Sequence, residues 1–367
     1  MRSTYLTAAI TLIALVACSE PDAQSQETIR QYQFGAGDDG RYALVLREVP
    51  RPEAGPDEVL VRIRATSLNR RDYRMLNETI GQNGVDRTGN VILSDGAGDV
   101  IAVGDNVTRW SVGDRVAGTF FTDWDDGKVT PAARASARGL ANGGMLSEII
   151  VTLENALVSI PEYLSYEEAA ALPCAAVTAW SGLFTTGDLQ PGEYVLLEGT
   201  GGVSTFGVLF AAAAGAQPII TSSSNDKLAR ARELGAVGTV NYREDEQWQQ
   251  TVRELTGGVG VDHVLEIGGR STLPRALEAL RMHGHMALIG SVTGDAPPID
   301  TAVLRSRIGS ISTISVGSRR DFEDMLAFME ERQMRPIIDS TFTFDQAQEA
   351  FDLMGNGSFM GKIVITM

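Results

Sequence analysis

The stretch Glu198-Gly199-Thr200-Gly201-Gly202-Val203-Ser204 decides the fold of this chain. It follows the apolar run 194–197 and leads into the largely apolar segment 205–214, so it predicts a strand, a tight glycine turn and a helix. A helix N-terminus offers free backbone N–H groups to a phosphate, and glycine removes the Cβ atoms that would keep a pyrophosphate away. The last position of the usual glycine pattern is Ser204, and a purely structural turn would also fit the motif by itself.

The segment after the turn supports the interpretation of the motif as a phosphate-binding turn, because strand-like and helix-like patterns alternate along it. The predicted elements are 218–221, 228–234, 239–241, 247–256, 263–266, 273–280 and 285–289. Alternating strands and helices are typical of a parallel sheet with helices on both faces. The sequence therefore predicts an α/β fold with a doubly wound parallel sheet.

The flanking segments have a different character. Strands are predicted at 42–47, 58–67, 98–103 and 115–118, and residues 122–144 lack periodicity and predict a long loop. Near the C-terminus, a helix at 321–331, a strand at 342–344, a helix at 345–354 and a strand at 362–365 are predicted. A β-rich domain therefore precedes the parallel sheet, in keeping with a chain of 367 residues that is long enough for two domains.

Charge and cysteine content exclude several classes of function. The net charge of −16 argues against nucleic acid as a partner and against an electrostatic hold on anionic lipid. The two cysteines, Cys18 and Cys174, are too few for a disulfide framework or a four-cysteine zinc site. His283 and His285 have the spacing of a metal-binding pair but lead into a predicted buried strand, so no metal site is expected there.

The first eighteen residues form a separate unit. Arg2 precedes the uncharged, mostly apolar run 5–16, which is too short to span a bilayer. The run ends in Leu15-Val16-Ala17-Cys18, which resembles a bacterial lipobox, and Ser19 to Thr28 is a polar tether. We expect Cys18 to be lipidated and to anchor the protein on the extracytoplasmic side of a bacterial membrane. The alternative is a misassigned start codon and a cytoplasmic protein, although the next methionine, Met75, already lies inside the first domain.

Five segments together resemble the medium-chain dehydrogenase/reductase superfamily, and the resemblance covers essentially all of residues 30–367. They are 112–116 (VGDRV), 169–180 (AAALPCAAVTAW), 199–204, 241–243 and 361–364 (GKIV). The chain is most similar to the zinc-free quinone-reductase-like branch and its alcohol-dehydrogenase-like neighbours. The resemblance implies a GroES-like catalytic domain at 29–164, a Rossmann NAD(P)-binding domain at 165–315, and a segment 316–367 that completes the catalytic domain. A homodimer is one assembly that it would allow.

The same resemblance allows the zinc-ligand positions of the family to be compared with the residues of this chain. Zinc-using members bind the ion through a cysteine, a His-Glu pair and a second cysteine. The first position corresponds here to Asn69, the pair to Ser94 and Asp95, and only Cys174 matches. Residues 119–145 contain no cysteine for a structural zinc. One soft ligand beside an amide and a hydroxyl is a poor zinc site, so no metal is expected.

The residue after the second predicted strand bears on the cofactor. NAD-binding members place an acid about twenty residues after the glycines to hold the ribose hydroxyls. Ser222 occupies that place, and the resemblance implies that Ser223, Lys227 and Tyr242 hold a 2′-phosphate. NADPH is therefore the expected cofactor, with NADH as an alternative. We interpret Asp226 as a helix N-cap, and a solvated helix lysine is the alternative for Lys227.

The remaining site residues are likewise implied by the resemblance. On the substrate side these are Asn69, Asp72 and Tyr73, and near the nicotinamide they are Cys174 and Thr178. The cofactor contacts, in addition to Thr178 and the residues above, are Gly199, Gly201, Gly202, Val203, Gly290 and Lys362. An aromatic lid of Phe120, Phe121 and Trp124 is one interpretation of these side chains, and core packing is the other.

The expected activity follows from the missing zinc. Without a Lewis acid, an alcohol is hard to deprotonate at neutral pH, whereas a conjugated carbonyl accepts hydride more readily. We therefore expect NADPH-dependent reduction of a small molecule such as a quinone, an enone or a related carbonyl compound. One alternative is a zinc-free alcohol dehydrogenase. Another is a non-catalytic envelope lipoprotein that keeps the fold as a binding module, because NADPH is expected to be scarce outside the cytoplasm.

Overall fold

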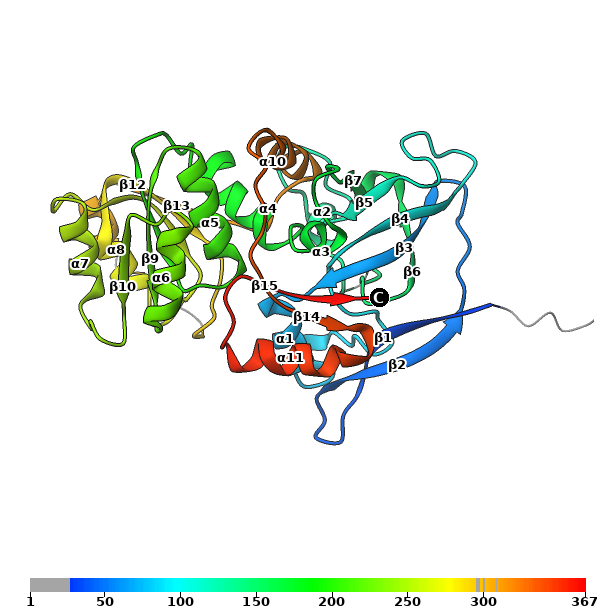
Figure 1. Cartoon of the computed structure of the whole chain (residues 1–367). Coiled ribbons are helices and arrows are strands. Elements are labelled where there is room, and N and C mark those ends of the chain that lie inside the picture. The colour runs from blue at the N-terminus through cyan, green and yellow to red at the C-terminus, as the bar shows by residue number, and fades with distance from the viewer. Residues whose placement is uncertain (1–26, 141, 295–297, 300, 308) are drawn as a thin grey trace, which may run out of the picture.

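The computed structural model describes residues 27–367 except 141, 295–297, 300 and 308. The expected leader, its Cys18 and most of the tether lie outside the described residues. Within the described residues, no helix is long and apolar enough to cross a membrane. The chain forms two halves, each built on one large sheet, and they are joined through α10 and β15 (Figure 1).

A six-stranded parallel sheet forms the core of the green and yellow half in Figure 1. Its strands are β8 (Tyr194–Glu198), β9 (Gln217–Ser222), β10 (Gly238–Asn241), β11 (Val261–Glu266), β12 (Leu280–Leu288) and β13 (Ser310–Thr313). Their order is β10-β9-β8-β11-β12-β13. The chain thus builds outward from β8 in one direction and then restarts at β11 in the other. In such sheets a ligand binds beyond the carboxyl ends of the strands at this reversal.

Four helices of this half follow the predicted order with shifted ends, and a fifth, α9, was not predicted. They are α5 (Gly202–Ala213), α6 (Asn225–Glu233), α7 (Trp248–Leu255), α8 (Leu273–Ala279) and α9 (Thr301–Arg307). The interpretation of Asp226 as an N-cap is wrong. Ser224 caps α6, since its hydroxyl accepts from the Lys227 N–H, while Asp226 lies within the first turn. An acid there still interacts favourably with the helix dipole.

The other half is β-rich, as predicted. It contains the hairpin of β1 (Thr28–Ala36) and β2 (Tyr42–Pro50) and a seven-stranded sheet of order β14-β15-β3-β4-β5-β7, with β6 paired to β3. The strands of that sheet are β3 (Glu58–Ser67), β4 (Asp95–Val103), β5 (Arg115–Gly118), β6 (Ile149–Leu153), β7 (Leu157–Ser159), β14 (Ile338–Thr343) and β15 (Lys362–Thr366). The two C-terminal strands enter this sheet where β15 pairs antiparallel with β3. The β-rich half and the six-stranded parallel sheet together confirm the predicted α/β fold class.

Several segments of the β-rich half differ from the sequence-based predictions, which did not include β6 or β7. Strand β1 begins at Thr28, inside the segment interpreted as tether, because Phe34 and Ile29 bury their side chains in the β domain. The predicted loop 122–144 contains the short helix α2 (Pro131–Ala135), which Thr130 caps. The other helices of the β-rich half are α1 (Arg70–Leu76), α3 (Tyr166–Ala170) and α11 (Ala347–Asn356), while α4 (Ala175–Trp180) packs against α5 of the other half.

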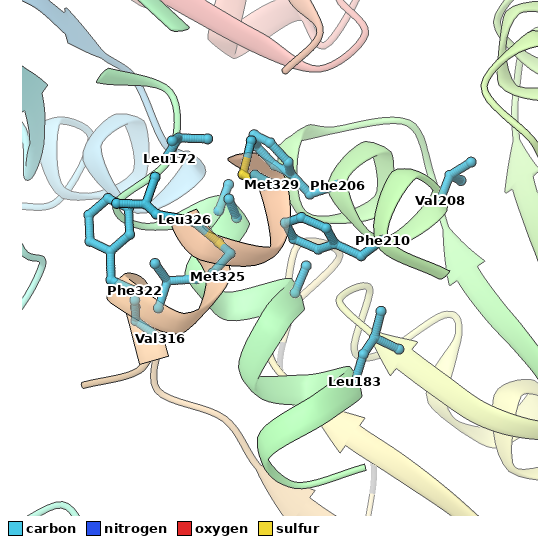
Figure 2. Close-up of a cluster of buried hydrophobic side chains, with 14 of the residues drawn as sticks. Leu172, Leu183, Phe206, Val208, Phe210, Val316, Phe322, Met325, Leu326 and Met329 are labelled. Atoms are coloured by element: carbon cyan, nitrogen blue, oxygen red, sulfur yellow. The ribbon is translucent and has the colours of Figure 1, made fainter. Parts of the chain in front are cut away.

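A shared hydrophobic cluster joins the two halves. Helix α10 (Arg319–Glu331) packs on α4, and the cluster in Figure 2 unites Phe206 and Phe210 of α5 with Phe322 and Met325 of α10. These four side chains are at most 1 % exposed. Burying a large apolar side chain stabilises a fold by about 1.5–3 kcal/mol. The cluster therefore holds the end of β8 in a fixed position against the β-rich half.

Candidate functional site

The glycine turn lies at the reversal point of the parallel sheet. Gly199 follows β8 in the left-handed conformation (φ +70°), which favours glycine. Gly201 is the N-cap residue of α5 and has ordinary backbone angles (φ −77°, ψ −176°). No side chain caps this end of the helix. A Cβ atom added at Gly201 would meet no atom within 4 Å. Open space and uncapped N–H groups at a helix N-terminus fit the pyrophosphate of a dinucleotide.

The turn also contacts the β-rich half. The N–H group of Gly361 donates to the Thr200 carbonyl (2.9 Å), and Gly201 forms a bridge with Gly361. A Cβ atom at Gly202 would lie 2.8 Å from Cδ of Lys362 and 3.0 Å from Cβ of Ala175. The absence of a side chain at Gly202 thus lets β15 and α4 approach the turn closely.

The other residues expected at the cofactor lie at the same edge of the sheet. Ser222 ends β9, and its carbonyl accepts from the Tyr242 N–H group (3.1 Å) just after β10. Gly290 follows β12, and its N–H group donates to the Glu266 carbonyl (3.3 Å). Ser223 is partly buried beside Ser222. These placements agree with a ligand that extends over the ends of β8, β9 and β10.

Lys227 is neither free nor fully solvated. Its ammonium donates to the carbonyl oxygens of Phe359 (2.8 Å) and Gly357 (3.3 Å), in the segment that leads to β15. Partial burial lowers the pKa of Lys227, and Asp339 opposes that effect. An ammonium has three N–H donors, so these two contacts leave one for a further acceptor.

A polar cluster lies where β15, α1 and α4 meet. The Lys362 ammonium donates to the Asn69 Oδ1 atom (2.6 Å) and to the Leu68 carbonyl (2.8 Å), and it lies 3.6 Å from Asp95 Oδ2. The same Asp95 oxygen accepts from the Cys174 N–H group (3.1 Å). The structure therefore brings together Asn69, Asp95 and Cys174, which are far apart in the sequence. Lys362 was expected to contact the cofactor, and its ammonium lies in this cluster.

Asp72 is a buried carboxyl group beneath the cluster. Its Oδ2 atom accepts from the Asn69 N–H group (2.8 Å), while Oδ1 has no hydrogen-bond partner. Burial raises the pKa of Asp72 to about 6, against the opposing charge of Arg71. A carboxyl with a pKa near neutrality can hold or release a proton under physiological conditions. The sequence pattern did not reveal this property, because it depends on burial.

Cys174 has the opposite character. Burial, followed by the nearby charge of Asp95, raises the pKa of its thiol far above the ordinary range. A neutral, buried thiol is a poor nucleophile. Its backbone N–H group, by contrast, holds Asp95 in place.

The remaining expected residues are less central to the cluster. Thr178 lies one turn after Cys174 on α4 and donates its hydroxyl to the Cys174 carbonyl (2.6 Å). Tyr73 packs toward α11, where a Cβ atom at Gly355 would lie 2.6 Å from its ring. Phe120 and Phe121 are buried in the core cluster, which agrees with the core-packing interpretation.

Two buried glutamates lie beside the glycine turn and were not singled out in the sequence. Glu198 ends β8 and accepts weakly from the N–H groups of Ile267 (3.3 Å) and Gly268 (3.4 Å). Burial and the adjacent carboxyl of Glu266 raise the pKa of Glu198 well above its usual value. The raised pKa favours the neutral form of Glu198 and so reduces negative charge beside the glycine turn. The sequence signal was an acid at the end of each of the two central strands.

Comparison with known proteins identifies the families and relatives that this chain resembles. Residues 55–162 match the alcohol dehydrogenase GroES-like domain, and residues 202–331 match the zinc-binding dehydrogenase family. A zinc-type alcohol dehydrogenase-like protein of Schizosaccharomyces pombe is 42 % identical over 87 % of this chain and 93 % of its own length. A quinone oxidoreductase of Pseudomonas aeruginosa is 30 % identical over 92 % of this chain and 99 % of its own.

A solved structure shows the same fold. The structure of an alcohol dehydrogenase candidate from Sinorhizobium meliloti is 37 % identical in sequence and superimposes with a TM-score of 0.86. The match covers 93 % of this chain and 99 % of that protein.

The zinc in the names of these relatives does not fit the polar cluster. Within the described residues, no three His, Cys, Asp or Glu side chains gather as a metal site would require. Asn69 stands where zinc-using members have a cysteine, and the Lys362 ammonium already lies between Asn69 and Asp95. A fixed positive charge at that point repels a divalent cation.

Proposed function

Because the chain belongs to the medium-chain dehydrogenase/reductase superfamily and is an NAD(P)-dependent oxidoreductase, we propose that it is a zinc-independent reductase that uses NADPH. The proposed substrate is a quinone, an enone or a related conjugated carbonyl compound. The observation that carries the proposal is the Lys362 ammonium, which is bonded to Asn69 and lies 3.6 Å from Asp95. By resemblance, Asn69 and Asp95 correspond to metal-ligand positions of zinc-using relatives.

The preference for NADPH rests on the end of β9. Ser222 stands where a carboxylate would hold the ribose hydroxyls of NADH, and it would not repel a 2′-phosphate. Lys227 and Tyr242 lie at the same edge of the sheet and are the proposed phosphate contacts. Gly199, Gly201, Gly202 and Val203 would hold the pyrophosphate.

The proposed catalytic domain comprises residues 29–164 and 316–367, and the proposed cofactor domain comprises residues 165–315. The bound cofactor supplies the hydride. The chain's own residues position the substrate. The buried carboxyl of Asp72 can hold a proton near neutral pH because its pKa is raised to about 6, and water supplies the proton that the product takes up.

The alternative activity is oxidation of a simple alcohol. It is motivated by the alcohol dehydrogenase-like name of the relative that is 42 % identical. A zinc-free site gives no evident means of removing the hydroxyl proton, so we favour reduction of a conjugated substrate.

Turnover by the purified full chain tests the proposal. NADPH and NADH oxidation would be followed with phenanthrenequinone and cyclohexenone, and NADP⁺ reduction with cyclohexanol. We expect NADPH-dependent reduction of the conjugated compounds and little oxidation of cyclohexanol. Faster oxidation of the alcohol would favour the alternative, and binding of NADPH without turnover of any compound would favour a non-catalytic binding module.

We also propose that Cys18 is lipidated and that the protein is a membrane-anchored lipoprotein. The support is the Leu15-Val16-Ala17-Cys18 sequence behind a short apolar run. A single acyl chain binds membranes only marginally, whereas two or more give stable attachment. We therefore expect a Cys18→Ser variant to leave the membrane fraction or to remain unprocessed. A wild-type protein found in the soluble cytoplasmic fraction with residues 1–17 attached would contradict this expectation.

A further inference from the structure

One donor in the polar cluster has no acceptor. The Asn69 side chain is 8 % exposed, and its Nδ2 atom is buried without a hydrogen-bond partner. Buried amide N–H groups are rarely left unpaired in folded proteins, and the exceptions point to a function or a ligand. The donor lies at the meeting point of the two halves, next to the residues that contact the glycine turn.

Lys362 determines which way the Asn69 amide points. Its ammonium donates to Oδ1 over 2.6 Å and can only donate, so rotating the amide would place an NH₂ group against NH₃⁺. The Leu68 carbonyl holds the ammonium from a second side at 2.8 Å. The amide oxygen is thereby committed to Lys362, and the amide NH₂ group remains as the free donor.

The position of this donor relative to the cofactor follows from the lysine stem. Cδ of Lys362 passes beside Gly202, since an added Cβ atom there would lie 2.8 Å away. The same side chain therefore contacts the turn proposed to hold the pyrophosphate at one end and Asn69 at the other. A nicotinamide that extends from that turn toward the β-rich half would bring the substrate close to Asn69.

We propose that Asn69 is a catalytic hydrogen-bond donor that stabilises the negative oxygen of the substrate, and that Lys362 is the positioning residue that orients it. This inference rests on the proposed reductase function. During the reaction, hydride from NADPH bonds to the substrate carbon and NADP⁺ is formed. The displaced π electrons move onto the carbonyl oxygen, which accepts a hydrogen bond from Asn69 Nδ2 until a proton from water completes the product. Asn69 Nδ2 and the Lys362 ammonium thus stabilise the negative oxygen, as a zinc ion would in a zinc-using relative.

The decisive variant is Asn69→Asp, which keeps an oxygen for Lys362 and replaces only the NH₂ group. Loss of one oxyanion-hole donor in a hydrolase lowers kcat about 100-fold or more. We expect that loss with cyclohexenone or phenanthrenequinone, while the NADPH dissociation constant changes less than about threefold. Asn155→Asp, at an exposed position of the β-rich half, is the matched control and should behave as wild type. Wild-type kcat in Asn69→Asp would overturn the assignment.

A double-mutant cycle tests the positioning role of Lys362. If Lys362 acts through Asn69, then Lys362→Met lowers kcat in the wild type but causes no further loss in an Asn69→Leu background. Equal losses in both backgrounds would show that Lys362 acts independently and would overturn its proposed role. If Lys362→Met fails to fold, the Asn69→Asp comparison still decides the role of the donor.

A binding measurement separates this inference from the proposed function. p-Nitrophenolate carries an anionic oxygen on a conjugated ring, and its binding to the NADP⁺ complex can be followed by its absorbance. We expect Asn69→Asp to bind it at least about tenfold more weakly than wild type, because a carboxylate repels the anion. Such a loss without turnover of any substrate would contradict the reductase proposal alone. Equal binding by both proteins would contradict the role of Asn69.

Discussion

A Gly201→Val variant is expected to lose NADPH binding and to remain folded. The backbone angles of Gly201 are accessible to valine, and an added Cβ atom would meet no atom within 4 Å. The side chain would instead fill the space proposed for the pyrophosphate. We expect the NADPH dissociation constant to rise about 100-fold or more, equivalent to about 2.8 kcal/mol, as measured by NADPH fluorescence titration.

The stability of the same variant is the internal control. Replacing an N-cap glycine with valine costs about 1 kcal/mol, so Tm should fall by only a few degrees. Gly143→Val is the matched variant, because an added Cβ atom there also meets nothing within 4 Å and the backbone is not left-handed. It should bind NADPH as wild type does. Unchanged NADPH affinity in Gly201→Val would show that the cofactor does not bind over this turn.

The Lys227→Ala variant is expected to lose selectivity for NADPH. A hydrogen bond between an ammonium and a phosphate contributes about 1.5–3 kcal/mol, or roughly 10- to 100-fold in affinity. NADH has no 2′-phosphate, so its affinity should be nearly unchanged. The comparison would be made by titrating both cofactors against wild type and variant.

The contacts of Lys227 make the NADH measurement necessary. Its ammonium holds the carbonyl oxygens of Gly357 and Phe359, just before the strand that carries Lys362. Removing it could therefore loosen a segment that serves both cofactors. Equal loss of NADH and NADPH affinity would indicate that structural role and would contradict a phosphate contact.

Much of the fold could be predicted because its signals are local. The alternation of apolar strands and helices after residue 194 predicted five of the six strands of the parallel sheet, although the prediction placed the start of β12 at residue 285 and not at Leu280. The edge strand β13 was not predicted. The strand at 58–67 was predicted with its observed ends because apolar residues run through it between turn residues. Strand β1 and the short helix α2 were missed, since each depends on tertiary packing or a cap rather than on periodicity.

The site was only partly predictable, for a related reason. Asn69, Asp95 and Cys174 could be selected by resemblance, and the structure brings them together. The orientation of the Asn69 amide, the raised pKa of Asp72 and the Lys362 contact depend on burial and on atoms almost three hundred residues apart. No sequence pattern records such contacts. The N-cap of α6 was predicted wrongly for a simpler reason. Ser224 and Asp226 are both residue types that cap helices well, and the position at which the backbone becomes helical selects Ser224.

Zinc content measured together with turnover tests the central claim most directly. The purified full chain would be analysed for metals, treated with a strong chelator, and assayed for NADPH-dependent reduction of phenanthrenequinone before and after. The account predicts no stoichiometric zinc and the same rate after chelation, because Lys362 holds the place between Asn69 and Asp95. One zinc ion per chain, with activity that is lost on chelation and restored by added zinc, would contradict it.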